Sequence, residues 1–334
     1  MRVGIIGAGA VGGAIAAVLA RGGHDVEVTA RRAQLKAIQD SGIHLDGEWG
    51  SYDAAVGASR LLSRKPDLVI VTTKAHDAAS ALTANAAFVD GAPVLVIQNG
   101  LAGLDTAASA APGSPVVGGL AMFAASFLKP GRVTVTGPGV TYLGGGAGPA
   151  LDLASGLLSA VLPIEIVQNF AGAQWSKLVV NQINALPAIT GLSAQEVIAD
   201  RGLRRLMTAS IRENIRIGIA NGITFADLHG LTDRRLRSVA RLPLALGEAL
   251  PRQFARRMGS VPNPGSTQQS IRRGQPSEID YLNGAVVTAA KSVGLDAPIN
   301  AALVELVHEV ELSYVFISPA EVLRRVTALA GGAF

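Results

Sequence analysis

Short apolar or alternating runs separated by polar turns dominate the first half of the chain. They cover residues 3–6, 24–29, 68–72 and 93–97. The last two are almost wholly apolar, which is typical of strands that a parallel sheet buries on both faces. Further strand patterns lie at 116–119, 132–136, 139–144 and 164–167, with a short β segment over 43–56 and a helical pattern over 149–161. We therefore expect an α/β domain over residues 1–167.

Long patterns with helical periodicity replace the strands in the second half. They predict helices over residues 171–186, 193–221, 232–258, 301–314 and 319–330, and a further helix that begins within 277–284. A loop with two prolines at 261–267 interrupts the series. We therefore expect an all-α domain over residues 168–334, with the domain boundary near Gln168.

Three glycines follow the first strand pattern in the spacing G-x-G-x-x-G. Gly7, Gly9 and Gly12 lie between that strand and an alanine-rich helical run that continues to Leu19. This arrangement places backbone N–H groups at a helix N-terminus, where they bind a diphosphate. Gly7 permits the tight turn, Gly9 leaves room for the diphosphate, and Gly12 lets the helix approach the strand. Because the strand pattern at 24–29 completes a βαβ unit, we favour a Rossmann-type dinucleotide site over a glycine-rich turn of another α/β fold.

The same N-terminal stretch shares some features with a secretory signal. Residues 3–20 carry no charge and follow Arg2. Five of them are glycine, which a helical signal core tolerates poorly, so we expect a folded strand and helix instead. No later apolar run reaches the roughly twenty residues that cross a bilayer, and no membrane span is expected.

Composition narrows the classes of function. The 334 residues are enough for two ordinary domains, and 49% apolar against 16% charged residues predicts a compact globular chain. Cysteine is absent, which excludes disulfides, thiolate metal sites and cysteine nucleophiles and fits a reducing cytoplasm. The aromatic share of 4% disfavours a stacking platform for single-stranded nucleic acid.

Positive charge is concentrated in the second half. Residues 1–167 hold 11 Lys and Arg against 12 Asp and Glu, whereas residues 168–334 hold 18 against 13. A basic second half favours anionic substrates, and the lack of a long single-sign run argues against nucleic-acid binding. We interpret the following side chains as solvated helix faces and predict no metal site: Arg204, Arg205, Arg234, Arg235, Arg237, Glu305, His308 and Glu309.

Two arginines follow the second strand pattern, where an NAD site usually has an acidic residue. A carboxylate there accepts from the ribose 2′-hydroxyl but repels a 2′-phosphate. Ala30-Arg31-Arg32 offers guanidinium groups instead, which bind phosphate in a bidentate manner. The sequence therefore favours NADP(H), with exposed residues at a helix start as the alternative interpretation.

Polar side chains also follow the two most apolar strand patterns. Lys74 comes after the run at 68–72, and Asn99 comes after the run at 93–97. Ligands of open α/β sheets bind beyond the carboxyl ends of the strands, so Lys74 is placed to meet a phosphate or ribose. Asn99 offers an amide donor and acceptor. Ordinary turn residues are the alternative for both.

A polar stripe runs along the first helical pattern of the second half. At 100° per residue, Asn181 lies about 40° from Lys177, and Asn184 lies about 20° to its other side. Residues 178–180 are apolar. A polar stripe on an apolar helix needs water or a ligand, so we expect a ligand-facing stripe, with an ordinary exposed face as the alternative. Glu278 opens a later helical pattern, where it is either functional or simply favourable to the helix dipole.

Five motifs resemble the ketopantoate reductase family (2-dehydropantoate 2-reductases) over nearly the whole chain. They are GAGAVG at 7–12, TTKAHD at 72–77, QNG at 98–100, WSKLVVN at 175–181 and SEIDYLNG at 277–284. The resemblance implies a Rossmann domain followed by a helical domain, with the active site in the cleft between them. It also implies NADPH-dependent reduction of a 2-oxo acid to a 2-hydroxy acid, with 2-dehydropantoate and pantothenate biosynthesis as the first expectation.

Residue roles follow from the same resemblance. Lys177 matches the catalytic lysine that protonates or polarises the ketone oxygen, and Glu278 matches the carboxylate that supports it. The implied NADP(H) site comprises Gly7, Gly9, Ala10, Val11, Gly12, Arg31, Lys74 and Asn99. The implied substrate contacts are Asn99, Asn181, Asn184, Asn263 and Ser266.

The chemistry of these residue types agrees with the resemblance, but the substrate shell departs from it. A ketone that accepts hydride becomes an alkoxide, which a lysine ammonium can protonate or stabilise. The family's second asparagine position holds Ala185, next to Asn184, and residues 266–270 read Ser-Thr-Gln-Gln-Ser where the family tends to have Ser-Met and a later aspartate. The alternatives are a related dehydrogenase for another 2-oxo or imino acid, or a non-catalytic dinucleotide-binding protein. The apolar helical half offers a surface for a homodimer.

Overall fold

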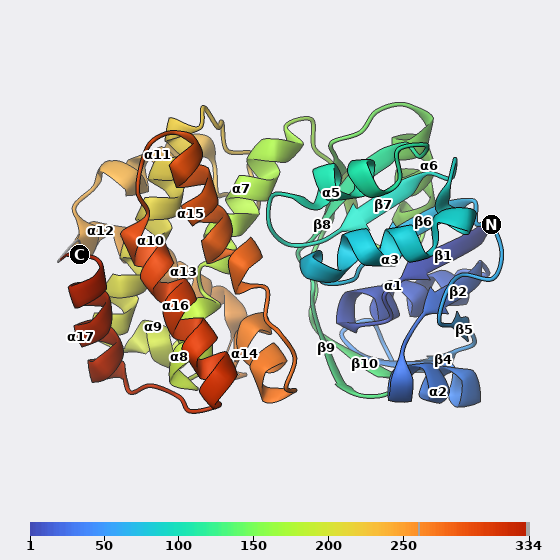
Figure 1. Ribbon diagram of the computed structural model, residues 1–334, viewed down its shortest axis with the longest axis horizontal. Helices are drawn as coiled ribbons and strands as arrows, with labels where there is room; N and C mark the ends of the chain where they lie inside the picture. The colour runs from blue at the N-terminus through green and yellow to red at the C-terminus, as the bar shows by residue number, and fades with distance from the viewer. Residues whose placement is uncertain (260, 332–334) are drawn as a thin grey trace. The chain divides into compact units, whose positions relative to one another are not determined.

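The computed structural model describes residues 1–259 and 261–331. These residues separate into two compact units, Met1–Phe170 and Ala171–Phe334, which Figure 1 colours from blue to green and from green to red. The boundary between the two units therefore lies after Phe170, close to the boundary after residue 167 that the sequence predicts. The first unit carries the strands, and the second unit is built from helices.

The first unit is organised around one eight-stranded sheet with the order β12-β11-β8-β7-β6-β1-β2-β5. Its strands are β1 (Arg2–Ile6), β2 (Asp25–Thr29), β5 (Gly57–Ser59), β6 (Leu68–Val71), β7 (Val94–Ile97), β8 (Val116–Ala121), β11 (Thr141–Gly144) and β12 (Ile164–Ile166). β1 lies between β2 and β6 and is parallel to both, while β8 and β11 are antiparallel. The predicted Rossmann-type sheet is confirmed.

A second sheet of four strands, in the order β4-β3-β10-β9, packs on α1. Its strands are β3 (Ile43–Gly47), β4 (Tyr52–Ala54), β9 (Ala124–Lys129) and β10 (Arg132–Gly137). The helices of this unit are α1 (Ala10–Arg21), α2 (Arg32–Ser41), α3 (Ala78–Ala84), α4 (Ala86–Val89), α5 (Gly103–Ala110) and α6 (Pro149–Ser159), with the 3₁₀ turn η1 (Ala75–Asp77). The strand patterns at 43–56 and 132–136 are confirmed, whereas β5 and β9 were not predicted.

The large sheet is buried on both faces, which explains its continuous apolar runs. Along β6, Leu68 and Ile70 belong to one hydrophobic core, and Val69 and Val71 belong to the other. The first core includes α1 and α6, and the second includes α3 and α5. Successive side chains of a strand point to opposite faces, so each strand supplies both cores.

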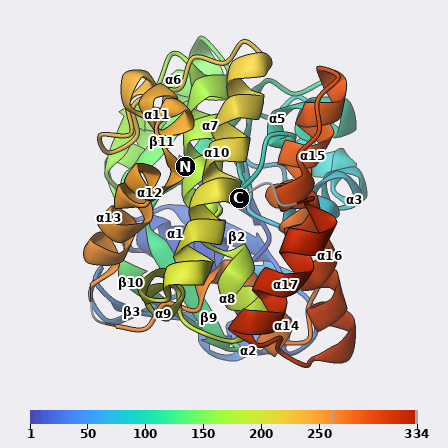
Figure 2. The same ribbon diagram turned by 90° about the vertical axis from the view of Figure 1, so that its left-hand side faces the viewer.

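The second unit is a bundle around the long helix α10. Its helices are α7 (Phe170–Asn181), α8 (Ala185–Thr190), α9 (Ala194–Ala199), α10 (Arg201–Ala220), α11 (Asp233–Arg241), α12 (Leu244–Gly247), α13 (Ala249–Met258), α14 (Gly265–Arg272), α15 (Asn283–Ser292), α16 (Pro298–Ser313) and α17 (Pro319–Leu329), with the 3₁₀ turn η2 (Ile279–Tyr281). Figure 2 shows α10 running through the bundle, where it contacts α9, α11, α13, α15, α16 and α17. The helices predicted at 301–314 and 319–330 are confirmed.

Three long predicted helices are interrupted in the structure. The helix predicted over 171–186 ends at Asn181, and α8 begins anew after Asn184. The helix predicted over 193–221 breaks at Asp200, whose ψ of 128° is extended and whose side chain caps α10 by accepting from the Leu203 amide. The helix predicted over 232–258 breaks at Leu242, because a residue before proline is disfavoured in the helical region.

Two boundaries near predicted site residues also differ. The loop predicted over 261–267 ends early, because α14 begins at Gly265. The segment at 277–284 forms the short turn η2 before α15 begins at Asn283. Glu278 therefore precedes the turn η2. The sequence had suggested instead that Glu278 lies in the first turn of a long helix. Among the described residues, no helix is long and apolar enough to cross a membrane.

One of the five arginines predicted to be solvated is instead part of a buried ion pair. The Arg204 side chain is 11% exposed, and its Nε lies 2.7 Å from Oε2 of Glu248, which is 7% exposed. Arg204 also donates to the carbonyl oxygens of Ile198 and Ala199 at the end of α9. This guanidinium therefore joins α9, α10 and the start of α13.

We expect Arg204→Met to lower the free energy of unfolding by about 3 kcal/mol, because it leaves a buried carboxylate without its main partner. Arg205, its exposed neighbour on α10, provides the control, and Arg205→Met should change stability by less than about 0.5 kcal/mol. Chemical denaturation of both variants measures the difference. An equal decrease in the free energy of unfolding in both variants would show that the Arg204–Glu248 ion pair does not stabilise the fold.

Candidate active site

The glycine turn after β1 has a backbone conformation that favours glycine, in keeping with the predicted tight turn. Gly7 has φ = +109°, and a Cβ at this position would lie 2.7 Å from the Thr73 amide nitrogen. The Gly7 amide donates to Thr29 Oγ1 at 3.1 Å, and Thr72 Oγ1 donates to the Gly7 carbonyl oxygen at 2.7 Å. The turn is therefore fixed by hydroxyls from the ends of β2 and β6, its two neighbours in the sheet.

The other two glycines differ in what surrounds them. A Cβ at Gly12 would lie 2.0 Å from the Gly7 carbonyl oxygen and 2.2 Å from Thr72 Oγ1, so only glycine allows α1 to approach the turn. A Cβ at Gly9 would meet no protein atom within 4 Å. Gly9 caps α1 without a side-chain hydrogen bond, and Ala10 and Val11 form its half-buried first turn. The first N–H groups of a helix have no partner within the helix, so this open N-terminus fits a diphosphate.

Three arginines follow the carboxyl ends of the adjacent strands β2 and β5. Arg31 and Arg32 are exposed at the start of α2, with Arg31 extended and Arg32 at φ = +50°. The Ala30 amide donates to the Ser59 carbonyl oxygen, so the end of β5 lies beside them and is followed by the exposed Arg60. Arg60 was missed because β5 has only three residues and no apolar pattern. The one available sequence signal was an arginine directly after the short segment that forms β5, a strand parallel to β2.

The structure also brings together the segments that carry Lys74 and Asn99. Gln98 Nε2 donates to the Thr73 carbonyl oxygen at 2.7 Å, which ties the end of β7 to the end of β6. Lys74 caps η1 and is half-buried, as is Asn99. Both predicted residues therefore follow adjacent parallel strands on the same edge of the sheet as the glycine turn.

In the second unit, Lys177 is a buried cation. It lies on α7 with 8% of its surface exposed, so the alternative of an ordinary solvated face is wrong. Burial lowers the pKa of Lys177 to about 8, and the nearby Glu278 carboxylate acts in the opposite direction. Loss of hydration disfavours the charged ammonium, while an opposite charge favours it. The structure thus brings Lys177 and Glu278 together from segments about a hundred residues apart.

Asn181 lies one helical turn after Lys177 and is also buried, with 9% exposure. Its Nδ2 has no hydrogen-bond partner among the described residues. Buried polar atoms of native proteins are almost always paired with protein, water or ligand. An unpaired amide donor one turn from a buried ammonium therefore fits contact with a polar ligand.

Asn184 does not lie on the α7 stripe, because the helix ends three residues earlier. The residue instead precedes α8, and its Oδ1 accepts from the Ser266 amide at 3.3 Å. Asn263 Oδ1 accepts from the Gly265 amide at 2.9 Å, just before α14. A Cβ at Gly265 would lie 2.6 Å from Asn184 Oδ1. Asn184, Asn263 and Ser266 therefore form a second polar group at the start of α14.

Gln182 is a buried residue that the sequence interpretation missed. Its Oε1 accepts from Ser210 Oγ of α10 at 2.6 Å and from Asn283 Nδ2 of α15 at 2.8 Å. The middle of α7 packs on α10 as well, where Trp175 lies against Gly218. These contacts fix the helix that presents Lys177. The only sequence signal was a polar residue within a run predicted to be helical.

Two of the three side chains that the sequence analysis considered as metal ligands are engaged by other residues. His308 contacts Asp280 and Glu311, and Glu309 pairs with Arg325. Within the described residues, no group of three or more His, Cys, Asp or Glu side chains is arranged to hold a metal ion.

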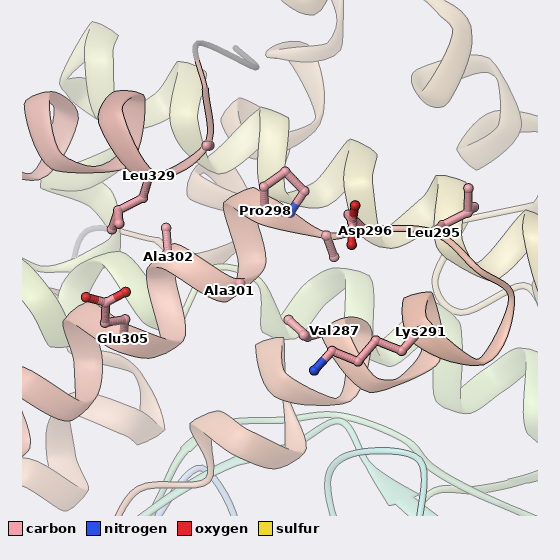
Figure 3. A pocket seen from close by; sticks show the side chains of 11 residues that line it. Val287, Lys291, Leu295, Asp296, Pro298, Ala301, Ala302, Glu305 and Leu329 are labelled. Atoms are coloured by element: carbon pink, nitrogen blue, oxygen red, sulfur yellow. The ribbon is translucent and has the colours of Figure 1, made fainter.

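A surface hollow of about 550 Å³ lies in the second unit among α15, α16 and the end of α17. Figure 3 shows Lys291 on α15 and Glu305 on α16 at its edge, with apolar side chains such as Val287 and Leu329. None of the predicted site residues lines it. The hollow is therefore separate from the residues around Lys177.

Two family models match most of the chain. The model described as "Ketopantoate reductase PanE/ApbA" matches residues 3–148, and "Ketopantoate reductase PanE/ApbA C terminal" matches residues 169–311. A 2-dehydropantoate 2-reductase of Pyrococcus abyssi is 28% identical over 91% of this chain and 95% of its own length. One of Mesorhizobium japonicum is 29% identical over 92% of this chain and 97% of its own.

Solved structures agree with these matches. A PanE/ApbA family ketopantoate reductase from Ralstonia eutropha JMP134 has a TM-score of 0.80 at 30% identity, covering 94% of this chain and 99% of its own. D-mandelate dehydrogenase, solved with NADH and anilino(oxo)acetate, has a TM-score of 0.77 at 22% identity over 94% of this chain and 99% of its own. At that identity the second likeness concerns the fold alone.

The glycine turn predicts different outcomes for two alanine substitutions. Gly12→Ala should lower the melting temperature, because its Cβ would overlap the Gly7 carbonyl oxygen and overpacking costs about 1–3 kcal/mol. Gly9→Ala should leave the melting temperature nearly unchanged yet weaken dinucleotide binding about tenfold or more, because its Cβ would meet no protein atom but would meet a diphosphate bound at this N-terminus. Thermal denaturation and fluorescence titration with NADPH measure the two effects. NADPH binding of wild-type strength in Gly9→Ala would remove the diphosphate from this position.

Proposed function

This chain belongs to the ketopantoate reductase family, and we propose that it reduces a 2-oxo acid to a 2-hydroxy acid with NADPH. Family membership makes it an oxidoreductase acting on CH–OH groups. 2-Dehydropantoate, the substrate in the names of its relatives, is the leading candidate. The product would then be pantoate, a precursor in pantothenate biosynthesis.

The burial of Lys177 beside Glu278 is the observation that carries this proposal. NADPH, when bound, supplies a hydride to the carbonyl carbon. The carbonyl oxygen then gains negative charge and needs a proton or a cation. A lysine with a pKa of about 8 is mostly protonated at neutral pH and is nevertheless a stronger acid than an exposed lysine. Lys177 is therefore suited to donate the proton.

Glu278 keeps this proton donor charged. Without a nearby carboxylate, burial would lower the pKa of Lys177 further, and less of it would be protonated at neutral pH. Asn181 supports substrate binding through its unpaired Nδ2, and Asn263, Ser266 and Asn184 form a second polar group for the substrate. In the first unit, Asn99 is assigned to the nicotinamide and substrate, and Lys74 to phosphate or ribose.

The arginines at the end of β2 support a preference for NADPH over NADH. Arg31 and Arg32 follow β2, and Arg60 follows the adjacent β5. Guanidinium groups bind phosphate strongly and have no comparable partner in a ribose 2′-hydroxyl. Three arginines at two adjacent strand ends, with no carboxylate in the Ala30-Arg31-Arg32 turn, support binding of the 2′-phosphate of NADPH.

A second 2-oxo acid remains a candidate because of the residues that replace the family's second asparagine. Ala185 is buried at the start of α8, and Asn184 Oδ1 is already engaged with the Ser266 amide. Thr267 Oγ1, in the adjoining turn, is buried and has no hydrogen-bond partner among the described residues. These features alter the polar group at α14, so the substrate's side chain is where a difference from 2-dehydropantoate would arise.

The proposal is tested by following the oxidation of NADPH and NADH with a panel of 2-oxo acids. The panel contains 2-dehydropantoate, analogues that lack its hydroxyl or its methyl groups, and aromatic 2-oxo acids. Turnover with at least one member, faster with NADPH, is expected. NADPH binding without oxidation of NADPH by any member would contradict the proposal.

The buried lysine predicts the pH dependence of turnover. kcat/KM should be constant below pH 8 and fall above it, because Lys177 loses its proton near its pKa of about 8.

Lys177→Ala should reduce kcat about 10²- to 10⁴-fold, while NADPH binding survives. Lys291 is an exposed lysine of the same unit and provides the control, so Lys291→Ala should keep the wild-type pH profile of kcat/KM. Glu278→Gln removes the carboxylate that raises the pKa of Lys177, so the alkaline fall should move to lower pH.

An unchanged profile in Glu278→Gln would separate the carboxylate from the lysine. Turnover of wild-type strength in Lys177→Ala would exclude this lysine as the proton donor.

Cofactor preference has its own test at Arg31. Arg31→Ala should raise KM for NADPH by about tenfold or more and leave KM for NADH nearly unchanged, because a charge-assisted hydrogen bond to phosphate is worth about 1.5–3 kcal/mol. Steady-state kinetics with both cofactors measure this ratio. A parallel increase in both KM values would mean that Arg31 does not recognise the 2′-phosphate.

A further inference from the structure

Glu278 lies on a segment that has little regular structure of its own. The residue precedes the three-residue turn η2, and its φ of −107° and ψ of 22° are not those of an α-helix. Leu282, at the end of the turn, is also irregular. A carboxylate on such a segment needs contacts from neighbouring helices to hold it beside Lys177.

Two residues of α16 bind the segment on both sides of Glu278. Glu311 Oε1 accepts from the Ser277 amide at 2.7 Å. One helical turn earlier, His308 Nδ1 lies 3.0 Å from Glu311 Oε2, and its Nε2 lies 3.0 Å from Asp280 Oδ1. The imidazole therefore links the two contacts into one chain that passes from Ser277 through Glu311 and His308 to Asp280.

The charge of His308 decides how strong this chain is. A neutral imidazole has one N–H group, whereas both of its nitrogens here face carboxylate oxygens. Burial opposes the charged form, but the hydrogen bonds to Asp280 and Glu311 outweigh it and raise the pKa of His308. When it is protonated, the imidazole donates to both carboxylates at once.

The other charged groups on and beside α16 do not contribute to the pKa shift of His308. Glu309 pairs with Arg325 of α17, while Glu305 of α16 and Lys291 of α15 line the surface hollow. The charges that act on His308 are therefore Asp280 from η2 and Glu311 from its own helix.

The end of the segment has a separate attachment to α7. Asn283 Nδ2 donates to Gln182 Oε1 at 2.8 Å and to Asn300 Oδ1 at 2.9 Å. Gln182 follows Asn181 directly. The segment is thus tied at its far end to the helix that carries Lys177, and the contacts of His308 and Glu311 fix the end that carries Glu278.

We propose that His308 is a positioning residue that, through Asp280 and Glu311, holds the Glu278 carboxylate next to Lys177. This inference rests on the proposed role of Glu278. His308 does not touch the substrate in this account, and it acts only by keeping the segment 277–280 against α16. Loss of the His308 side chain should therefore reproduce, in weaker form, the loss of the Glu278 charge.

The test combines His308→Gln, Glu278→Gln and the double variant. His308→Gln should lower kcat about fivefold, leave KM for NADPH unchanged, and move the alkaline fall of kcat/KM toward lower pH. Adding His308→Gln to Glu278→Gln should change neither kcat nor the profile further, because both act through one carboxylate. Glu305→Gln, an exposed carboxylate one turn earlier on α16, provides the control and should match the wild type.

The outcomes separate this inference from the proposed function. A wild-type profile in His308→Gln, together with an altered Glu278→Gln, would overturn the positioning role alone. Wild-type behaviour of Glu278→Gln would overturn the role of the carboxylate itself. A further loss in the double variant would show that His308 acts by another route. If His308→Gln does not fold, Asp280→Asn removes one exposed carboxylate of the chain and should move the profile in the same direction.

Discussion

The loss of hydration around the Lys177 ammonium is the constraint on which the account depends. An exposed lysine has a pKa of about 10.4 and releases its proton reluctantly. Burial on α7 lowers the pKa of Lys177 to about 8, and the Glu278 carboxylate limits that decrease. The balance leaves a group that is charged at neutral pH and acidic enough to donate its proton. Neighbouring helices help to maintain this balance: α10 contacts α7 at Trp175 and just after its end at Gln182, and α16 holds the segment that carries Glu278.

The first unit meets a different constraint, which is close approach between backbone groups. Gly7 and Gly12 permit contacts of α1 and β6 with the turn that any side chain would prevent. Threonine hydroxyls at the ends of β2 and β6 fix that turn, and the N-terminus of α1 stays open beside Gly9. The strand ends that follow carry the arginines, Lys74 and Asn99. Because parallel strands share one carboxyl edge, residues far apart in sequence gather there.

Much of this could be predicted from the sequence, and the failures have physical causes. The glycine turn and the buried strands were predictable, because backbone geometry and two-sided burial restrict which residues can occur there. Asn184 was placed on the wrong element, because the helical periodicity of residues 171–186 continues past Asn181, where α7 ends. The prediction that Arg204 lies on a solvated helix face was wrong, because its partner Glu248 lies 44 residues away in the sequence. Arg60, Gln182 and His308 depend on contacts of the same long-range kind.

The most direct test is the titration of Lys177 itself in the cofactor-free protein. Lysine labelled with ¹³C at Cε can be followed by NMR across pH 6–12, with Lys177→Arg identifying the resonance. We expect a midpoint near the pKa of about 8 that burial produces. A midpoint near 10.5, the ordinary value for lysine, would show that the ammonium is hydrated and would contradict its role as the buried proton donor.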